Sequence, residues 1–375
     1  MYPVLPSLDA SNWLYIAEGF NSILFRWVGD SSSSMNNKAL RLFKQAQDPS
    51  RSRLSNDGER ESFADLQNRY NENYIIPYLD GLDVGIVYSI TTGFLESMAQ
   101  VAEPYRPEKR RRESKIQMNS TICLIHDNLV PPGSISIEIK LKCGFKPDTP
   151  YVPLDSVKRK VSRFRMLQYL KVAKGEVPKF SYYEPEDIFS RDPARIMNAL
   201  NALEDSPQCN LKMFKDGTQC PFDSNIKEPI VKTLSSCKIL DQILALQKLD
   251  VFDVEGIIYA IDIATNPTWH DLCEKGVVSI YQKIVSGEIA IPNTREEADR
   301  FIDNMDIETS RAFIAAFLIS QAARDCSIMI TFDQSFENPK ISVIDMDMKN
   351  PNLVYKRYYV IDQETCSFYL KQQSE

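Results

Sequence analysis

The run from Ile135 to Phe145, ISIEIKLKCGF, combines a strand pattern with closely spaced charges. Apolar residues hold alternate positions, namely Ile135, Ile137, Ile139 and Leu141, and the residues between them are Ser136, Glu138, Lys140 and Lys142. This period of two predicts a strand with its charges on one face. Two ammonium groups about 7 Å apart on that face repel each other unless a multiply charged anion lies between them. The run therefore predicts either an anion-binding site or a solvent-exposed strand face, because lysines are also common on exposed strands.

Two carboxylates near the C-terminus have the spacing of a metal site. The segment 341–344 is predicted to be a strand, and Asp345 and Asp347 follow it directly. On one pleat face at the end of a strand, two carboxylates can hold a hard cation. The spacing therefore predicts a Mg²⁺ site formed by Asp345 and Asp347.

The composition excludes several classes of protein. The 375 residues are 43% apolar, which is enough for one large lobe or two smaller ones. No apolar run approaches the ~20 residues of a membrane span, and the first residues lack the features of a signal peptide. We therefore expect a soluble intracellular protein without a membrane partner. The net charge of −7 argues against a non-specific nucleic-acid binder, which is normally basic, so we expect no direct nucleic-acid partner.

Cysteines and basic segments give weaker signals. Eight cysteines are scattered without repeated CxxC pairs, so we expect reduced thiols and no disulfide framework. His270 and Cys273 have the spacing of two metal ligands, but a structural zinc needs four. The segments 109–112 (KRRR) and 158–165 are predicted to form dense positive patches. For KRRR, a solvated loop, a nuclear-import signal and an anion site all remain open.

The periodicity predicts strands mainly in the first third of the chain and helices in the rest. Strands are predicted on both sides of a turn within 12–28 and at 38–43, 84–88, 121–125 and 327–332. A polar linker is predicted over 45–60, followed by a helix over 61–79 that packs in a small N-terminal lobe. Other helices are predicted over 154–172, after an N-cap at Ser190 or Asp192, twice within 226–264 with a break at 253–256, and twice within 296–324.

Six ordered segments of the chain resemble the signatures of one enzyme family, the inositol-pentakisphosphate 2-kinases. They are EIKLKCGF (138–145), SRFRMLQYLK (162–171), YYEPEDIFS (182–190), PQCNLKMF (207–214), RDCSIMITF (324–332) and IDMDMKN (344–350). The resemblance, with a fungal member as the expected kind, implies a two-lobed α+β fold like that of inositol-phosphate kinases and protein kinases. A β-rich N-terminal lobe over 1–127 and a helical C-terminal lobe with a small sheet over 128–375 would enclose the active site.

The resemblance also assigns roles to individual residues. Asp325 matches the catalytic base, and Asp345 with Asp347 would hold Mg²⁺. The ATP-binding candidates are Gly19, Asn21, Ser22, Arg41, Asp127, Glu138, Lys212 and Met329. The substrate-binding candidates are Arg110, Lys140, Lys142, Lys171, Asn210, Lys349 and Tyr358. One further Arg of the family pattern is matched by either Lys356 or Arg357. Cys209 stands where the family has Asn, and His126 and Asp127 reverse the family's order.

The implied activity is transfer of a phosphoryl group from ATP to the 2-hydroxyl of inositol 1,3,4,5,6-pentakisphosphate, giving inositol hexakisphosphate (phytate). The implied cofactors are ATP and Mg²⁺, and we expect a monomer in the nucleus, the cytoplasm or both. Two alternatives remain. A basin of cations does not by itself set the position that is phosphorylated, and a non-catalytic inositol-phosphate sensor or scaffold would keep the same basin. The presence of both Asp325 and Asp345 favours a kinase over a sensor.

Overall fold

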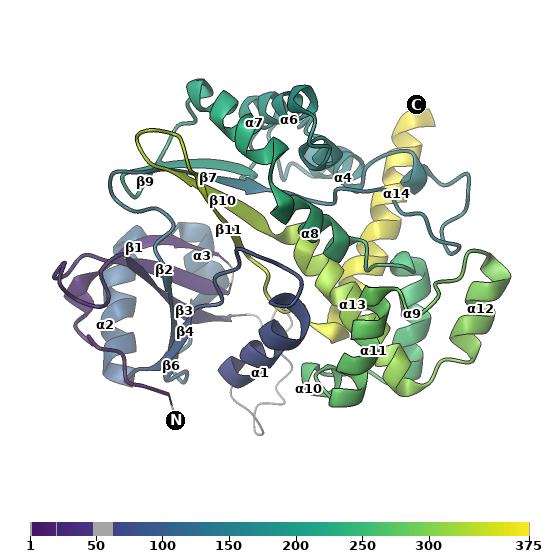
Figure 1. The fold of residues 1–375 in the computed structure, drawn as a ribbon, viewed down its shortest axis with the longest axis horizontal. Coiled ribbons are helices and arrows are strands. Elements are labelled where there is room, and N and C mark those ends of the chain that lie inside the picture. Colours follow the sequence, from purple (N-terminus) through teal and green to yellow (C-terminus); the bar gives the residue numbers. More distant parts are fainter. Residues whose placement is uncertain (1, 20, 48–62, 375) are drawn as a thin grey trace.

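The computed structural model describes residues 2–19, 21–47 and 63–374, and it shows an α+β fold with two antiparallel sheets and many helices. In Figure 1 the first sheet lies toward one end of the long axis, the second sheet lies above it in this view, and helices α9 to α13 lie toward the other end. The predicted α+β class is confirmed. None of the helices among these residues has the length and apolar character needed to cross a bilayer.

The first sheet is built from the N-terminal strands. Its strands are β1 (Trp13–Glu18), β2 (Ser22–Trp27), β3 (Lys38–Ala46), β4 (Ile86–Ser89), β5 (Ser114–Ile116) and β6 (Ile122–Asp127). The order is β1-β2-β3-β6-β4, and β5 pairs with the end of β3. Helix α2 (Thr92–Ala102) packs on it through Phe94 and Met98 over a core that includes Phe25 and Leu40. The short helix α3 (Glu108–Glu113) carries the KRRR segment.

The second sheet brings together three distant parts of the chain. Its strands are β7 (Ile135–Lys140), β8 (Leu211–Lys215), β9 (Thr218–Cys220), β10 (Ser327–Phe332) and β11 (Lys340–Ile344), in the order β11-β10-β7-β8-β9. The register pairs Met329 with Glu138 and Glu138 with Lys212. Three candidate residues therefore lie side by side across the middle of this sheet.

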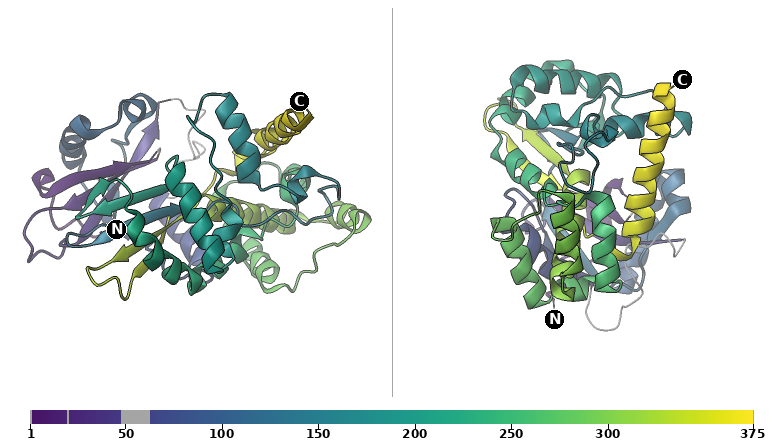
Figure 2. Two further views of the ribbon diagram at one scale, coloured as in Figure 1. Left: turned by 90° about the horizontal axis from the view of Figure 1, so that it is seen from above. Right: turned by 90° about the vertical axis from the view of Figure 1, so that its right-hand side faces the viewer.

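Helices supply the remaining core. They are α1 (Phe63–Tyr70), α4 (Arg163–Ala173), α5 (Pro185–Phe189), α6 (Pro193–Asp205), α7 (Lys227–Ser235), α8 (Lys238–Gln247), α9 (Asp253–Ala264), α10 (Trp269–Leu272), α11 (Lys275–Ser286), α12 (Arg295–Asp303), α13 (Ile307–Asp325) and α14 (Val360–Ser374). Helix α13 is buried along most of its length, between α8, α9 and α11. Figure 2 shows α14 along one side of the molecule, with its C-terminal end projecting from the body.

Several predicted elements differ in extent. Strand β7 ends at Lys140, because Lys142 has a φ of 61° that turns the chain away from the strand direction. Ser136 and Glu138 are buried, so the charged face is not a solvent-exposed strand face. The helix predicted from 154 begins only at Arg163, where the Ser162 hydroxyl accepts a hydrogen bond from the Arg165 amide (3.2 Å).

Two helical predictions need further correction. The segment 226–264 forms three helices instead of two, and the break precedes Asp253, which begins α9. Helix α1 and the turn after it pack Leu66, Tyr70 and Tyr74 into the larger core with the C-terminal helices, and not into the core of the first sheet as predicted. Most of the predicted polar linker lies outside the described residues, since 48–62 are not described.

Candidate active site

A cavity of about 180 Å³ lies where the two sheets meet. The first sheet contributes Ser22 and Arg41, and the second contributes Met329. Arg41 alternates along β3 with buried Leu40 and Leu42, so its guanidinium faces away from the core of the first sheet and toward the cavity. The segment after β11 and the end of β6 complete the wall with Asp127, Asp345 and Asp347. The fold thus brings together six of the residues predicted to bind ATP or Mg²⁺.

The two carboxylates after β11 face cations across this cavity. Arg41 contacts Asp347 (Nη2 to Oδ1, 2.8 Å), and Lys140 contacts Asp345 (Nζ to Oδ2, 3.4 Å). Burial opposes the charge of Arg41, but the pKa of Arg41 is raised because Asp347 and Asp345 stabilise the guanidinium. Asp345 has a φ of 67°, so the strand ends before it. The prediction that both carboxylates share a pleat face is therefore wrong, although both line the cavity.

Oxygen ligands of this kind suit Mg²⁺, which is usually bound by one or two carboxylates together with phosphates and water. Within the described residues, no group of three or more His, Cys, Asp or Glu side chains is placed to hold a metal by itself. Asp345 and Asp347 therefore fit a metal that is completed by nucleotide phosphates. His270 and Cys273 belong to no such group in the described part of the chain.

The turn between β1 and β2 approaches the cavity from the first sheet. The Gly19 amide donates to the Ser22 carbonyl (3.0 Å), and the Asn21 carbonyl accepts from the Lys44 amide (2.7 Å). Glu18, directly before the turn, is fully buried and contacts both Lys44 and Arg106. Among the described lining residues, Ser22 belongs to this turn, whereas Gly19 and Asn21 do not appear. The turn is therefore anchored at its base by a buried ion group.

Glu138 lies beside Met329 in the second sheet, Lys212 lies beside Glu138 on the strand beyond, and Met329 lines the cavity. Lys212 contacts Glu138 (Nζ to Oε2, 2.7 Å), and the Ser327 hydroxyl donates to the other carboxylate oxygen (3.3 Å). The described cavity lining includes their neighbour Met329 but neither of these two residues. Asp127, in contrast, lines the cavity and contacts Lys38 (2.8 Å) and Lys340 (2.9 Å).

Asp325 lies at the end of α13, beside a group of cations. Lys349 is buried and contacts its carboxylate (Nζ to Oδ2, 2.7 Å), while the Asp325 side chain is half exposed. Burial favours the neutral acid, but Lys349, Lys142 and Arg357 together lower the pKa of Asp325 well below its usual range. Asp325 is therefore a carboxylate at neutral pH.

Lys142 shows the opposite electrostatic balance. Burial lowers its pKa, and repulsion from Lys140, Lys171 and Lys349 adds to this, whereas Asp325 opposes it. We call the five residues Lys140, Lys142, Lys171, Lys349 and Arg357 the cation basin. Such repulsion is relieved when a multiply charged anion binds.

The remaining substrate candidates take different positions. Asn210 is buried, and its carbonyl accepts from the Lys140 amide (2.9 Å), so its loop supports the end of β7. Tyr358 packs edge-on against Phe317 of α13, with ring centroids 5.6 Å apart. Arg110 on α3 contacts Glu113 (2.8 Å), and its charge acts on Lys44 in the first sheet. The structure thus places Arg110 beside the first sheet.

Gln247 supports the loop after β7, and no sequence pattern predicted this role. Its buried side-chain amide accepts from the Gly144 amide (2.7 Å) and donates to the carbonyls of Lys142 (2.8 Å) and Ala323 (3.0 Å). It therefore ties the end of β7 to the end of α13. All three partners are backbone groups distant in sequence, so no local pattern could reveal the residue. Arg357, one of the two candidates for the further family Arg, is among the charges that lower the pKa of Asp325.

Asp83 and His126 form another pair that the sequence did not single out. Both line the cavity, and their side chains lie 3.5 Å apart (Oδ1 to Nδ1). The amides of Asp127 (2.6 Å) and Gly85 (2.9 Å) both donate to the Asp83 carboxylate. Although burial opposes it, His126 and the two amides that donate to the carboxylate lower the pKa of Asp83 to about 2.

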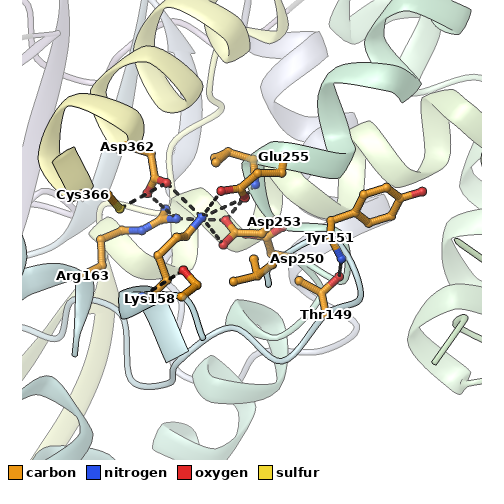
Figure 3. Close-up of polar contacts among 12 residues, drawn as sticks. Thr149, Tyr151, Lys158, Arg163, Asp250, Asp253, Glu255, Asp362 and Cys366 are labelled. Atoms are coloured by element: carbon orange, nitrogen blue, oxygen red, sulfur yellow. Dashed lines mark hydrogen bonds and ion pairs between the residues drawn. The ribbon is translucent and has the colours of Figure 1, made fainter. Parts of the chain in front are cut away.

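A second group of ion pairs contains the buried residues Lys158, Asp253 and Asp362 and the partly buried residues Arg163 and Glu255, and we call these five residues the Lys158 cluster (Figure 3). Lys158 contacts Asp253 (2.6 Å), Glu255 (2.8 Å) and Asp362 (2.9 Å). Arg163 likewise contacts Asp253 and Asp362. The prediction of a dense positive patch over 158–165 is therefore wrong for Lys158 and Arg163, because carboxylates from α9 and α14 pair with both.

Comparison with known proteins gives a consistent result. A family model described as inositol-pentakisphosphate 2-kinase matches residues 15–364. The curated relatives named inositol-pentakisphosphate 2-kinase include one from Arabidopsis thaliana, 26% identical over all of this chain and 96% of its own length. Another, from Cryptococcus neoformans, is 25% identical over 98% of this chain and 95% of its own length. The chain therefore belongs to the inositol-pentakisphosphate 2-kinase family of kinases.

Proposed function

We propose that this kinase transfers the γ-phosphoryl group of ATP to the 2-hydroxyl of inositol 1,3,4,5,6-pentakisphosphate and forms inositol hexakisphosphate. The observation that carries the proposal is the position of Asp325: an ionised carboxylate, held by Lys349 at 2.7 Å, beside the surplus cations of the basin. The names of the relatives support the substrate. The proposed arrangement is two lobes, residues 1–127 and 128–375, with the active site between them.

In the proposed complex, the cavity between the sheets holds ATP. Arg41 and the turn with Gly19, Asn21 and Ser22 bind its phosphates, and Met329 packs against the adenine. Asp127, Glu138 and Lys212 complete the nucleotide site, with Glu138 and Lys212 acting from behind Met329. Support comes from the shared lining of the cavity by Ser22, Arg41, Asp127 and Met329.

Asp345 and Asp347 would hold Mg²⁺, which neutralises charge on the transferred phosphoryl group when it is bound. Their present partners, Arg41 and Lys140, are residues that the proposal assigns to the phosphates of the two substrates. Binding of nucleotide and substrate would therefore give these cations new partners and leave the carboxylates available to the metal.

The acceptor would lie in the cation basin, with Asn210, Tyr358 and Arg110 as further ligands. Phosphoryl transfer asks the protein mainly to position the reactants and to stabilise charge. Asp325 would accept a hydrogen bond from the 2-hydroxyl, orient its oxygen toward the phosphorus and take up its proton. Lys349 would hold Asp325 in place and keep it ionised. Its ammonium would also contact a substrate phosphate.

The direct test is to incubate the purified chain with MgATP and inositol pentakisphosphate and to separate the products by anion-exchange chromatography. We expect hexakisphosphate from the wild type and a loss of about 10²–10⁴-fold in kcat for Asp325→Asn. Asp325→Asn should still bind pentakisphosphate, because it removes a negative charge from a cationic site. Asp262→Asn, an exposed carboxylate on α9, is the matched control and should leave kcat unchanged.

Two outcomes would overturn the proposal. Tight binding of pentakisphosphate by the wild type without turnover would show a sensor built on a kinase fold. Preferred turnover of inositol tetrakisphosphates would show a kinase of another positional specificity. We further propose a monomer in the nucleus, the cytoplasm or both, and the exposed basic residues Lys109, Arg111 and Arg112 of α3 support the nuclear location.

A further inference from the structure

Asp362 connects the C-terminal helix to the body of the molecule. It lies in the first turn of α14 and is 5% exposed. Its Oδ1 contacts Arg163 (Nη2, 2.7 Å), and its Oδ2 contacts Lys158 (Nζ, 2.9 Å). Figure 3 shows both cations between Asp362 and the carboxylates of α9. Each oxygen of this carboxylate therefore has a cationic partner from outside α14.

These contacts differ from a second ion pair at the same two helices, between Lys174, the residue directly after α4, and Glu364 of α14. Lys174 and Glu364 lie 2.8 Å apart, but both side chains are nearly half exposed. An exposed pair contributes little to stability because water and salt screen it. A buried charge that loses its partner is costly, because it stays out of water without compensation. Asp362 therefore fixes the position of α14 far more strictly than Glu364 does.

The start of α14 is joined directly to the cation basin. The helix continues from the π-helical turn Val354–Tyr359, which carries Arg357 and Tyr358. Tyr358 precedes Asp362 by four residues, so the two lie on the same face, and Tyr358 packs on Phe317 of α13. Arg163 begins α4, and Lys171 lies in the last turn of the same helix. The Asp362–Arg163 contact thus joins two helical segments that each carry basin cations.

We infer that Asp362 is a positioning residue for the acceptor site. Through Lys158 and Arg163 it holds α14 against α4 and α9, and this sets Arg357 and Tyr358 relative to Lys171 and Asp325. The inference rests on the proposed function, because the ligand of the basin is taken to be an inositol polyphosphate. The described cavity lining includes no residue of α14 or of 354–359, so we expect this contact to affect the acceptor site more than the proposed nucleotide site.

The test compares two ligands in Asp362→Asn, which keeps the side-chain shape and removes the charge. Isothermal titration calorimetry with inositol pentakisphosphate and with MgADP gives the two dissociation constants. We expect pentakisphosphate to bind at least tenfold more weakly and MgADP to bind within twofold of the wild type. Glu364→Gln, on the same helix and in the exposed pair, is the matched control and should change neither value.

A double-mutant cycle separates positioning from a general loss of structure. If Asp362 acts through the turn that carries Arg357, the loss caused by Asp362→Asn should shrink in an Arg357→Ala background. Equal weakening of both ligands, or unchanged pentakisphosphate binding by a folded Asp362→Asn, would overturn the inference. If Asp362→Asn does not fold, Asp362→Glu, which keeps the charge but displaces it by one methylene, is measured against the same two criteria. A wild type that fails to bind pentakisphosphate would instead contradict the proposed function.

Discussion

The Lys158 cluster and the cation basin both contain lysines among other charged side chains, but carboxylates predominate in the cluster and cations predominate in the basin. In the cluster, Lys158 is surrounded by carboxylates, and its pKa is raised because Asp253 and Asp362 outweigh the effect of burial. In the basin, the pKa of Lys142 is lowered, because burial acts together with repulsion from neighbouring lysines. For these two lysines, the direction of the pKa shift follows the charges around them, because the charges that act most strongly on Lys158 are carboxylates, whereas three lysines add to the effect of burial on Lys142.

The largest effect expected from this comparison is on stability, at Lys158. Lys158→Met would remove the buried ammonium group that contacts all three carboxylates of the cluster, those of Asp253, Glu255 and Asp362. Removing one partner of a buried ion pair costs about 3–5 kcal/mol in the free energy of unfolding. Urea unfolding followed by circular dichroism would measure this loss.

The matched control for this change is Lys174→Met, which breaks the exposed pair with Glu364. We expect it to cost less than about 1 kcal/mol. Equal unfolding free energies for Lys158→Met and the control would show that the cluster does not stabilise the fold, and the contrast with the basin would fail.

The sequence predicted the strands better than the helix boundaries. Alternation alone located the β1–β2 hairpin and strands β3, β10 and β11, because these runs are bounded by polar turns. It failed at the start of α4, where apolar residues at helical spacing continue upstream of the Ser162 cap. It also misjudged the 158–165 segment. The carboxylates that pair with Lys158 come from α9 and α14, which are distant in sequence. The residues next to Lys158 in the sequence therefore indicated only positive charge.

Sequence resemblance located most of the candidate site, and the structure explains what it missed. The six segments contain Asp325, the paired carboxylates and all four basin lysines, because the resemblance matches side chains at fixed motif positions. Gln247 acts through three backbone partners and Asp83 through a backbone amide, so neither role depends on a recognisable local pattern. Burial of Glu138 was missed for a similar reason, because its cation comes from neighbouring strand β8.

The next effect is on ligand affinity, at Lys142. Lys142→Met should weaken pentakisphosphate binding by about 1.5–3 kcal/mol, the typical contribution of a hydrogen bond to a charged group. The same change should leave the free energy of unfolding equal or higher, because it removes a cation repelled by Lys140, Lys171 and Lys349. Calorimetry and urea unfolding would measure the two quantities on one preparation.

Lys146→Met provides the control within the same segment. Lys146 contacts Glu186 (2.6 Å) at a partly exposed position, so its loss should change affinity little. A Lys142→Met variant that is strongly destabilised but binds pentakisphosphate normally would reverse the assignment of the two regions.

The smallest effect is a pH dependence confined to the basin. Because the pKa of Lys142 lies below the usual value of about 10.4, this lysine loses its proton at lower pH than ordinary lysines do. Between its own pKa and about 10.4, the unfolded chain binds more protons than the folded one, so stability contributed by Lys142 rises with pH. Affinity for a polyanion changes in the opposite direction, because the ligand prefers the charged lysine. We expect less than about a tenfold loss of affinity per pH unit in this window, since one proton is involved.

Lys142→Arg keeps its charge throughout and should remove this loss. Because the ligand's phosphates titrate equally in both experiments, the variant also corrects for their titration. Identical pH profiles for the wild type and Lys142→Arg, measured by calorimetry, would contradict the lowered pKa of Lys142 and the repulsion from its neighbouring lysines.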